Sequence, residues 1–309
     1  MSKHIFVFLL VFVFSADLLS QQLPITDNYL FNPSSISPAF TGKYYKFQSI
    51  LTYRHESTNI AGAPIVGNFI IDGIPHKNMG IGGNIILSKA GIYRNFTVNL
   101  NYAYHLQIAK EHFLSFGINA ALYQNYLDLS DIITRNQDDP LIAGNTSLSE
   151  TYFNAGLGFL YSWKDFNFCI SFPLLFNNRS LYADNDYQHV LAMDRNWLVY
   201  ANYTLNFHAD WKLQFDMLFR QNQYSPWTID VSALVKFRDN YWLGLLYRKT
   251  SIIGVTAGAT IIDRIIINYN FEFSGFAMDG VGGGTHEISL GYRIFREIPK
   301  NLQIKDYVR

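Results

Sequence analysis

Charge is scarce in this 309-residue chain, because only 16% of its residues are Asp, Glu, Lys or Arg, against roughly 25% in ordinary globular proteins. The 24 basic and 24 acidic residues cancel to a formal net charge of zero. A neutral chain has no overall field to draw it to nucleic acid, so no nucleic-acid partner is expected. The single cysteine, Cys169, excludes a disulfide framework and, since it lies far from the N-terminus, a lipid-anchored start.

The sequence also lacks an apolar run long enough to cross a bilayer as a helix. The run Ile5–Phe14 has ten residues, whereas a spanning helix needs about 20. It follows Lys3 and precedes small residues, which is the pattern of a secretory signal peptide. We expect residues 1–20 to be this signal, cleaved between Ser20 and Gln21, with Ala16 as the alternative site. Any membrane residence must then come from strands.

About fourteen short stretches of the chain alternate apolar and polar residues. In Phe96–Leu106, for example, every second residue is apolar, and the residues between them are mostly Asn, Thr or His. Strand side chains point alternately to two faces, so one face meets an apolar medium and the other a polar one. In a soluble sandwich the apolar face would cover a core. In an outer-membrane barrel it would face lipid, and the polar face would line a wet lumen.

The connections between these stretches alternate in length. Every second connection is short and charged, and the remaining connections include the longest loops, expected at Asp128–Glu150, Phe176–Asn196 and Ser274–Gly284. The short turns are expected at Pro75–Asn78, Lys110–His112, Lys164–Asp165, His208–Asp210, Arg238–Asn240 and Asp263–Arg264. Outer-membrane barrels have short periplasmic turns and longer external loops, whereas a soluble sandwich has no reason to keep this parity.

Aromatic residues are abundant, with 25 Phe, 21 Tyr and 5 Trp, as suits a surface that faces lipid and its two interfaces. We therefore predict an all-β fold, a transmembrane antiparallel up-and-down outer-membrane β-barrel of about 14 strands over residues 45–295. Its location would be the outer membrane of a Gram-negative bacterium, with membrane lipid as its first partner.

The alternation assigns a facing to each side chain. A charge that faces lipid at the midplane costs roughly 2–4 kcal/mol, and eight charged residues fall on the polar register that would face the lumen. They are Lys212, Asp216, Arg220, Asp230, Lys236, Glu272, Glu287 and Arg293. The lipid register would carry Phe153, Ala155, Leu157, Phe159 and Tyr161, then Leu213, Phe215, Met217 and Phe219, then Ile265, Ile267, Tyr269, Phe271 and Phe273.

The two ends of the mature chain lie outside the strand pattern. Residues 21–44 contain Pro24, Pro33 and Pro38 and show no clean period, so we expect an ordered but irregular lead-in. Residues 296–309 are polar and are expected to form a periplasmic C-terminal tail, or to be disordered. A barrel of about fourteen strands is too wide for its side chains to fill. Water, an inward-folded loop, the lead-in or a partner could occupy the lumen.

No residues are assigned a catalytic, cofactor-binding or metal-binding role. His286 and Glu287 are close to Ser289, but adjacent strand residues point to opposite faces, which argues against a hydrolase triad. His105 and His189 are isolated. Loop acids at Asp184–Asp186 and Asp138–Asp139 offer hard oxygen ligands, yet lack the spacing of a calcium loop, so solvated charge is the simpler interpretation. The glycines 282–284 follow no phosphate-binding pattern and are interpreted as loop flexibility or an inward turn.

An ordered set of motifs resembles the PorP/SprF family of type IX secretion proteins. The lead-in carries Asn32-Pro33 and then Ser37-Pro38-Ala39 followed by Gly42, where the family has Asn in place of Ser37. Arg54 ends the first strand as in the family, although His55-Glu56 then replaces the usual aromatic continuation. The remaining motifs are Gly80–Gly83, Tyr102-Ala103-Tyr104-His105, and the closing strand Thr285–Tyr292 with His286 and Glu287, which is the most specific match.

The resemblance spans Gln22–Phe295 and implies a non-enzymatic outer-membrane barrel of the Bacteroidetes. Such a barrel would help to export, or fix at the cell surface, cargo with a C-terminal targeting domain, including adhesins of gliding motility. The implied partners are that cargo, a periplasmic ring lipoprotein with its companion, and peptidoglycan-binding proteins. A passive outer-membrane pore or small-molecule transporter is the alternative, because a wet, charged lumen suits both functions. A lipid-modifying barrel enzyme is a further rival without a credible triad.

Overall fold

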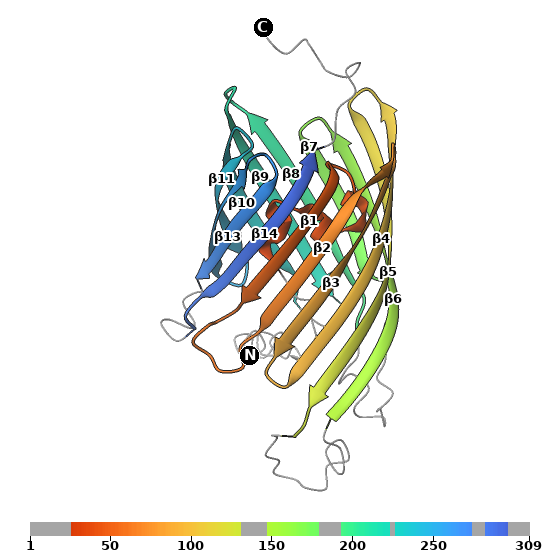
Figure 1. Cartoon of the computed structure of the whole chain (residues 1–309), viewed down its shortest axis with the longest axis vertical. Helices are drawn as coiled ribbons and strands as arrows, with labels where there is room; N and C mark the ends of the chain where they lie inside the picture. The colour runs from red at the N-terminus through yellow and green to blue at the C-terminus, as the bar shows by residue number, and fades with distance from the viewer. Residues whose placement is uncertain (1–25, 131–146, 179–192, 223–225, 274–281, 296–309) are drawn as a thin grey trace, which may run out of the picture.

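The computed structural model describes residues 26–130, 147–178, 193–222, 226–273 and 282–295. Its strands form one closed barrel in which each strand pairs antiparallel with its chain neighbours and β14 pairs with β1 (Figure 1). This confirms the predicted transmembrane up-and-down barrel of 14 strands. The strands are β1 Tyr45–His55, β2 Ile65–His76, β3 Met79–Ala90, β4 Tyr93–Ala109, β5 His112–Asp128, β6 Ser147–Trp163, β7 Phe166–Leu174, β8 Asn196–Asn206, β9 Trp211–Asn222, β10 Thr228–Phe237, β11 Tyr241–Arg248, β12 Ile252–Ile261, β13 Ile265–Phe273 and β14 Thr285–Phe295.

Several strands extend beyond the expected boundaries, and the ends of β5 and β2 are two examples. The expected loop Asp128–Glu150 is shorter, because the β5–β6 ladder continues through Leu127 opposite Leu148 to Asp128 opposite Ser147. Buried Leu129 and Leu148 form an apolar cluster that supports this extension. The expected turn Pro75–Asn78 is also shorter, since β2 runs to His76 with a register irregularity between Gly73 and His76. A bulge of this kind accommodates proline, which has no N–H to give to the ladder.

The short turns gather at one end of the barrel and the long loops at the other. Two of the short turns have both central residues at positive φ, Arg238-Asp239 (53° and 56°) and Ile262-Asp263 (53° and 54°). This is the type I′ geometry, whose twist matches that of the flanking strands. Because outer-membrane barrels keep short turns in the periplasm, the long-loop end is the external end.

The strand side chains that point outward are largely apolar and exposed. Leu100 is 68% exposed, Leu245 62% and Phe153 57%. The inner wall carries buried polar side chains such as Asn154 and Asn268. A soluble protein would not leave so continuous an apolar surface in water, so the wall faces lipid. Within the described residues, no helix is long and apolar enough to span a membrane.

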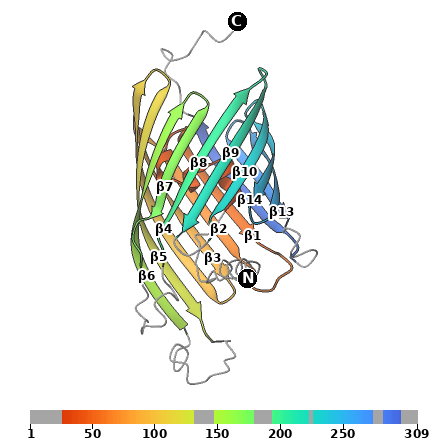
Figure 2. The same ribbon diagram turned by 180° about the vertical axis from the view of Figure 1, so that it is seen from behind.

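Residues 26–44 occupy the lumen, and we call this segment the lumen plug (Figures 1 and 2). It consists of three short 3₁₀ turns, η1 Asp27–Leu30, η2 Pro33–Ser35 and η3 Pro38–Phe40. Proline begins η2 and η3, where its fixed φ suits the first position of a turn and its missing N–H costs nothing. The plug leads directly into β1 at Tyr45.

Candidate functional site

The external end of the lumen plug is fixed by the carboxylate of Asp27, which is 1% exposed. Asp27 Oδ1 accepts a hydrogen bond from Arg248 Nη2 at 2.8 Å, and Asp27 Oδ2 lies 3.5 Å from Arg54 Nη1. The Asp27 backbone N–H donates to Glu287 Oε2 at 2.9 Å. One plug residue therefore contacts β1, β11 and β14.

The side chains around Asp27 form a buried network, which we call the ion cluster. Arg54 Nη1 donates to Glu287 at 3.2 Å, and Arg54 also pairs with Glu272. Arg248 donates to Glu272 at 2.7 Å and to Asp230 at 3.1 Å. Since an isolated buried charge is very costly, the network depends on each charge having partners. The ion cluster comprises Asp27, Arg54, Arg220, Asp230, Arg248, Glu272 and Glu287.

Electrostatics keep Asp27 ionised in this setting. Burial alone would raise the pKa of its carboxyl, but the adjacent Arg248 and Arg54 outweigh burial and lower the pKa of Asp27 below its ordinary value. Tyr29, in the same 3₁₀ turn, points its hydroxyl at Asp230 Oδ2 3.4 Å away. Burial, followed by the nearby carboxylates, raises the pKa of Tyr29, so its hydroxyl stays protonated as a donor. The charges of the plug and the wall thus favour a docked plug at neutral pH.

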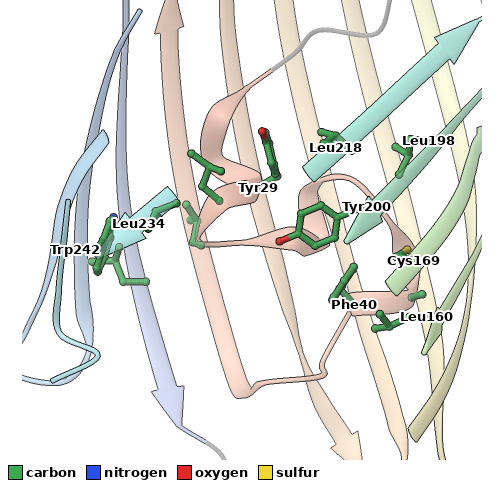
Figure 3. Close-up of a cluster of buried hydrophobic side chains, with 13 residues drawn as sticks. Tyr29, Phe40, Leu160, Cys169, Leu198, Tyr200, Leu218, Leu234 and Trp242 are labelled. Atoms are coloured by element: carbon green, nitrogen blue, oxygen red, sulfur yellow. The ribbon is translucent and has the colours of Figure 1, made fainter. Parts of the chain in front are cut away.

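The middle of the plug packs against an apolar patch on the inner wall (Figure 3). The Tyr29 and Phe40 rings meet Tyr200 edge-on, with ring centroids 6.1 and 5.8 Å apart, and Phe31 stacks on Trp242 at 6.0 Å. The wall side of the patch is Ile50, Leu160, Cys169, Leu198, Tyr200, Leu218, Leu234, Trp242 and Ile266. Of the four occupants considered for the lumen, the lead-in is the one that covers these apolar side chains.

Glycines on the wall allow the plug backbone to approach closely at η3. A Cβ atom on Gly117 would lie 2.3 Å from Ala39 N, and one on Gly158 would lie 2.4 Å from Ser37 Oγ. Near the periplasmic end, a Cβ on Gly80 would lie 1.9 Å from Thr41 O. Any side chain at these positions would push the plug off the wall.

A second polar contact holds the centre of the plug. Asp72 on β2 accepts hydrogen bonds from Gln48 Nε2 at 2.6 Å, Ser34 Oγ at 3.0 Å and the Gly42 backbone N–H at 3.1 Å. Gln48 also donates to Asn32 Oδ1 at 3.0 Å. One wall carboxylate thereby fixes residues eight positions apart in the plug.

The eight charges of the polar register lie in different parts of the lumen. Four of them, Arg220, Asp230, Glu272 and Glu287, belong to the ion cluster. Asp216 accepts a hydrogen bond from Tyr200 Oη at 2.7 Å, Lys236 donates to Gln214 at 2.6 Å, and Arg293 donates to the Phe31 carbonyl at 2.8 Å. Lys212 lies at the periplasmic rim, where it pairs with Asp239 at 2.6 Å.

The motif residues also separate into groups. Asn32, Pro33, Pro38, Ala39 and Gly42 are in the plug, whereas Arg54 and Glu287 are in the ion cluster. Tyr102 and Tyr104 are 37% and 38% exposed on the outer wall. His286 is also outward, with its Nδ1 2.6 Å from Tyr269 Oη.

The other residues considered for catalysis or metal binding either lie apart from one another or fall outside the described residues. Ser289 Oγ shares a hydrogen bond with Thr52 at 2.8 Å on the inner wall, while His286 faces outward. His105 contacts Ser115 Oγ and the Thr41 carbonyl at 2.8 and 2.9 Å. Residues 1–20, Asp138–Asp139, Asp184–Asp186, His189 and the tail 296–309 lie outside the described residues.

Two members of the ion cluster, Asp27 and Arg248, are absent from the sequence-based predictions. Alternation in β11 places Arg248 on the same inward face as Trp242, Gly244 and Leu246. The sequence pattern is therefore sufficient to assign Arg248 to the lumen. Asp27 lies in a segment without periodicity, and the sequence gives no comparable signal for its position.

Comparison with known families matches residues 18–292 to type IX secretion system membrane protein PorP/SprF. A search of curated proteins found no match. Among solved structures, the CymD monoaromatic hydrocarbon channel is similar with a TM-score of 0.52 at 8% identity, over 89% of this chain and 95% of that one. A Pseudomonas aeruginosa FadL homologue is similar with a TM-score of 0.50 at 10% identity, over 88% and 95%. At such identities these likenesses show the fold alone.

Proposed function

Because this chain belongs to the PorP/SprF family of type IX secretion membrane proteins and lies in the outer membrane, we propose that it is a non-enzymatic component that helps to export or surface-anchor cargo. The cargo would carry a C-terminal targeting domain, as gliding adhesins do. It would meet the barrel at the external end. The periplasmic turns and the tail 296–309 would meet the ring lipoprotein and peptidoglycan-binding proteins.

The observation that carries this proposal is the lumen plug. It is held at its external end by the ion cluster, near its centre by Asp72, and along η3 by close contact with glycines of the wall. A plug fixed at three places occupies space that a diffusion pore would leave open, which favours a partner-binding component. We expect its partners to meet the rims and loops of the barrel.

The external end offers a suitable platform. Strands β4, β5 and β6 have 17 residues each, and β5 and β6 reach beyond the other strands at that end (Figure 1). At the same end of the barrel, the β1–β2 and β13–β14 connections are joined, since Thr58 N–H donates to the Gly284 carbonyl at 3.1 Å. We place cargo contact on the external β5–β6 extension.

The test compares the surface and culture-medium proteomes of the parent and a strain that lacks this protein. Loss of one or two large surface proteins would indicate a cargo-dedicated role, and loss of every protein with the targeting domain would indicate a general one. An unchanged proteome would contradict the proposal. Complementation with a chain shortened in β5–β6 (both strands trimmed by equal, register-preserving deletions) tests the platform separately.

The second candidate is a passive pore, because the fold is similar to that of a hydrocarbon channel. Conductance in a planar bilayer separates the two candidates. We expect the full barrel to be nearly silent and a variant without residues 26–44 to give steady channels. A steadily conducting full barrel would favour the pore.

A further inference from the structure

A hollow of about 420 Å³ lies on the outer wall near the external end, across β1 to β5. Its floor is one row of the sheet, in which Tyr53 pairs with Gly67, Gly67 with Leu87, and Leu87 with Phe96. The hollow exists because Gly67 carries no side chain. A Cβ atom there would find its nearest non-neighbouring heavy atom only at 4.0 Å. The other residues of this row, Tyr53, Leu87 and Phe96, are 48%, 57% and 40% exposed, so the hollow is apolar and open to lipid.

Two cations lie side by side at the external edge of this hollow. Lys89 on β3 pairs directly with Arg94 on β4, and both are exposed and line the hollow. Like charges at directly opposed positions of a ladder repel each other. Arg94 Nη2 donates to Asp128 Oδ2 at 3.2 Å, whereas Lys89 makes no ion pair within the described part of the chain. Two cations and one carboxylate leave a net positive charge at this edge.

A second hollow of about 330 Å³ adjoins the first on its external side. It is formed mainly by the β1–β2 connection, including Thr58 and Asn59, and it shares Ile65 and Lys89 with the first hollow. Lys89 therefore stands between an apolar hollow on the lipid-facing wall and a second hollow beyond it, whose lining mixes the polar groups of Thr58 and Asn59 with apolar side chains such as Ile60. An apolar region, a cationic pair and a region of mixed polarity follow one another along the barrel axis.

We propose that the two hollows together bind one phosphorylated acyl glycolipid of the outer leaflet, of the lipid A class. An acyl chain would lie over Gly67 between Tyr53 and Phe96, a phosphate between Lys89 and Arg94, and the sugar against the β1–β2 connection. The external position favours this lipid, since the outer leaflet of an outer membrane consists largely of phosphorylated glycolipid. Charge-assisted hydrogen bonds to phosphate are strong, and partial exclusion of water by the surrounding lipid strengthens them. The bound lipid would also offset the Lys89–Arg94 repulsion.

The test is native mass spectrometry of the full-length mature barrel, released from detergent with added diphosphoryl lipid A. We expect lipid A to remain bound, and the double variant Lys89→Gln, Arg94→Gln to reduce its affinity by at least about tenfold, equivalent to 1.4 kcal/mol. Gly67→Leu should also reduce it, by filling the hollow without changing charge. The matched control is Arg195→Gln with Lys249→Gln, which removes two exposed cations from other connections at the same end.

Measurements with two other lipids show which part of lipid A the barrel recognises. Dephosphorylated lipid A should bind as weakly to the parent as lipid A binds to the double variant. Phosphatidylglycerol, which has a phosphate and acyl chains but no phosphorylated sugar, should be retained by the parent less well than lipid A. Equal retention of lipid A by parent and double variant would overturn the proposal, and so would equal losses in the control variant. Heat-modifiable migration on gels checks that each variant is folded.

Discussion

Asp27 and Arg248 are joined by a 2.8 Å hydrogen bond although 221 residues separate them. The contact places the start of the lumen plug against the last residue of β11, on the external side of the barrel. Because Arg248 also donates to Asp230 and Glu272, one guanidinium connects the plug to three strands. The stability of the plug and of the wall around it should therefore depend on this residue.

Replacing Arg248 by Gln should lower the free energy of unfolding by about 3–5 kcal/mol, because buried carboxylates lose their partner. Urea unfolding of the detergent-solubilised barrel measures the change. The control is Arg238→Gln, since Arg238 pairs with Asp210 at 3.0 Å and both side chains are exposed. An exposed pair contributes about 1 kcal/mol or less. Equal losses in the two variants would show that the ion cluster does not stabilise the fold.

The single cysteine reports on the position of the plug. Cys169 is fully buried in the apolar patch with Ala39 and Phe40, so a thiol reagent should label the folded parent slowly. Gly117→Val should speed labelling by more than tenfold, because the new side chain would displace Ala39. Gly67→Val is the matched control on the outer wall and should leave the labelling rate unchanged. Rapid labelling of the parent would contradict a docked plug.

The Asp27 carboxylate should make stability depend on pH in the acid range. Its pKa is lowered in the folded protein, so its contribution is present above the ordinary value of 3.8 and is lost as the pH falls through the lowered value. We expect the difference in unfolding free energy between the parent and Asp27→Asn to shrink as the pH falls below about 4. A difference that stays constant through this acid range would refute the assignment.

Lys43 should titrate near pH 8, well below the range of an ordinary lysine. Burial lowers the pKa of its ammonium group to about 8, and its Nζ donates to Ser162 Oγ. Because the folded pKa lies below the unfolded value, the cost of burying the charge is present below pH 8 and is relieved as the pH rises toward 10.5. Carbon-13 NMR of dimethylated lysines should show one signal that titrates near pH 8 and disappears in Lys43→Met. Titration of every lysine near its ordinary pKa would contradict this prediction.

The strands of the barrel wall could be predicted from the sequence, because the alternation of apolar and polar residues has one physical cause. That cause is the difference between the lipid on the outer side of the wall and the polar surroundings on its inner side. The expected turn Arg238–Asn240, for example, is the turn that the structure has between β10 and β11. The lumen was harder to predict, because inward apolar residues such as Leu218 and Leu234 have partners that are distant in sequence. The plug has no period at all, and its 3₁₀ turns are held by contacts with the wall. Arg54 and Glu287 appeared as motif residues, but only the structure places both beside Asp27.

The plug also bears on how the barrel closes. Arg54 of β1 and Glu287 of β14 are paired residues across the junction of the first and last strands, and both contact Asp27. Residues 26–44 are continuous with β1, so the docked plug joins the first strand to the last through Asp27 as well as through the backbone ladder. A chain without the plug would lose this second connection, and we expect its first and last strands to separate more readily.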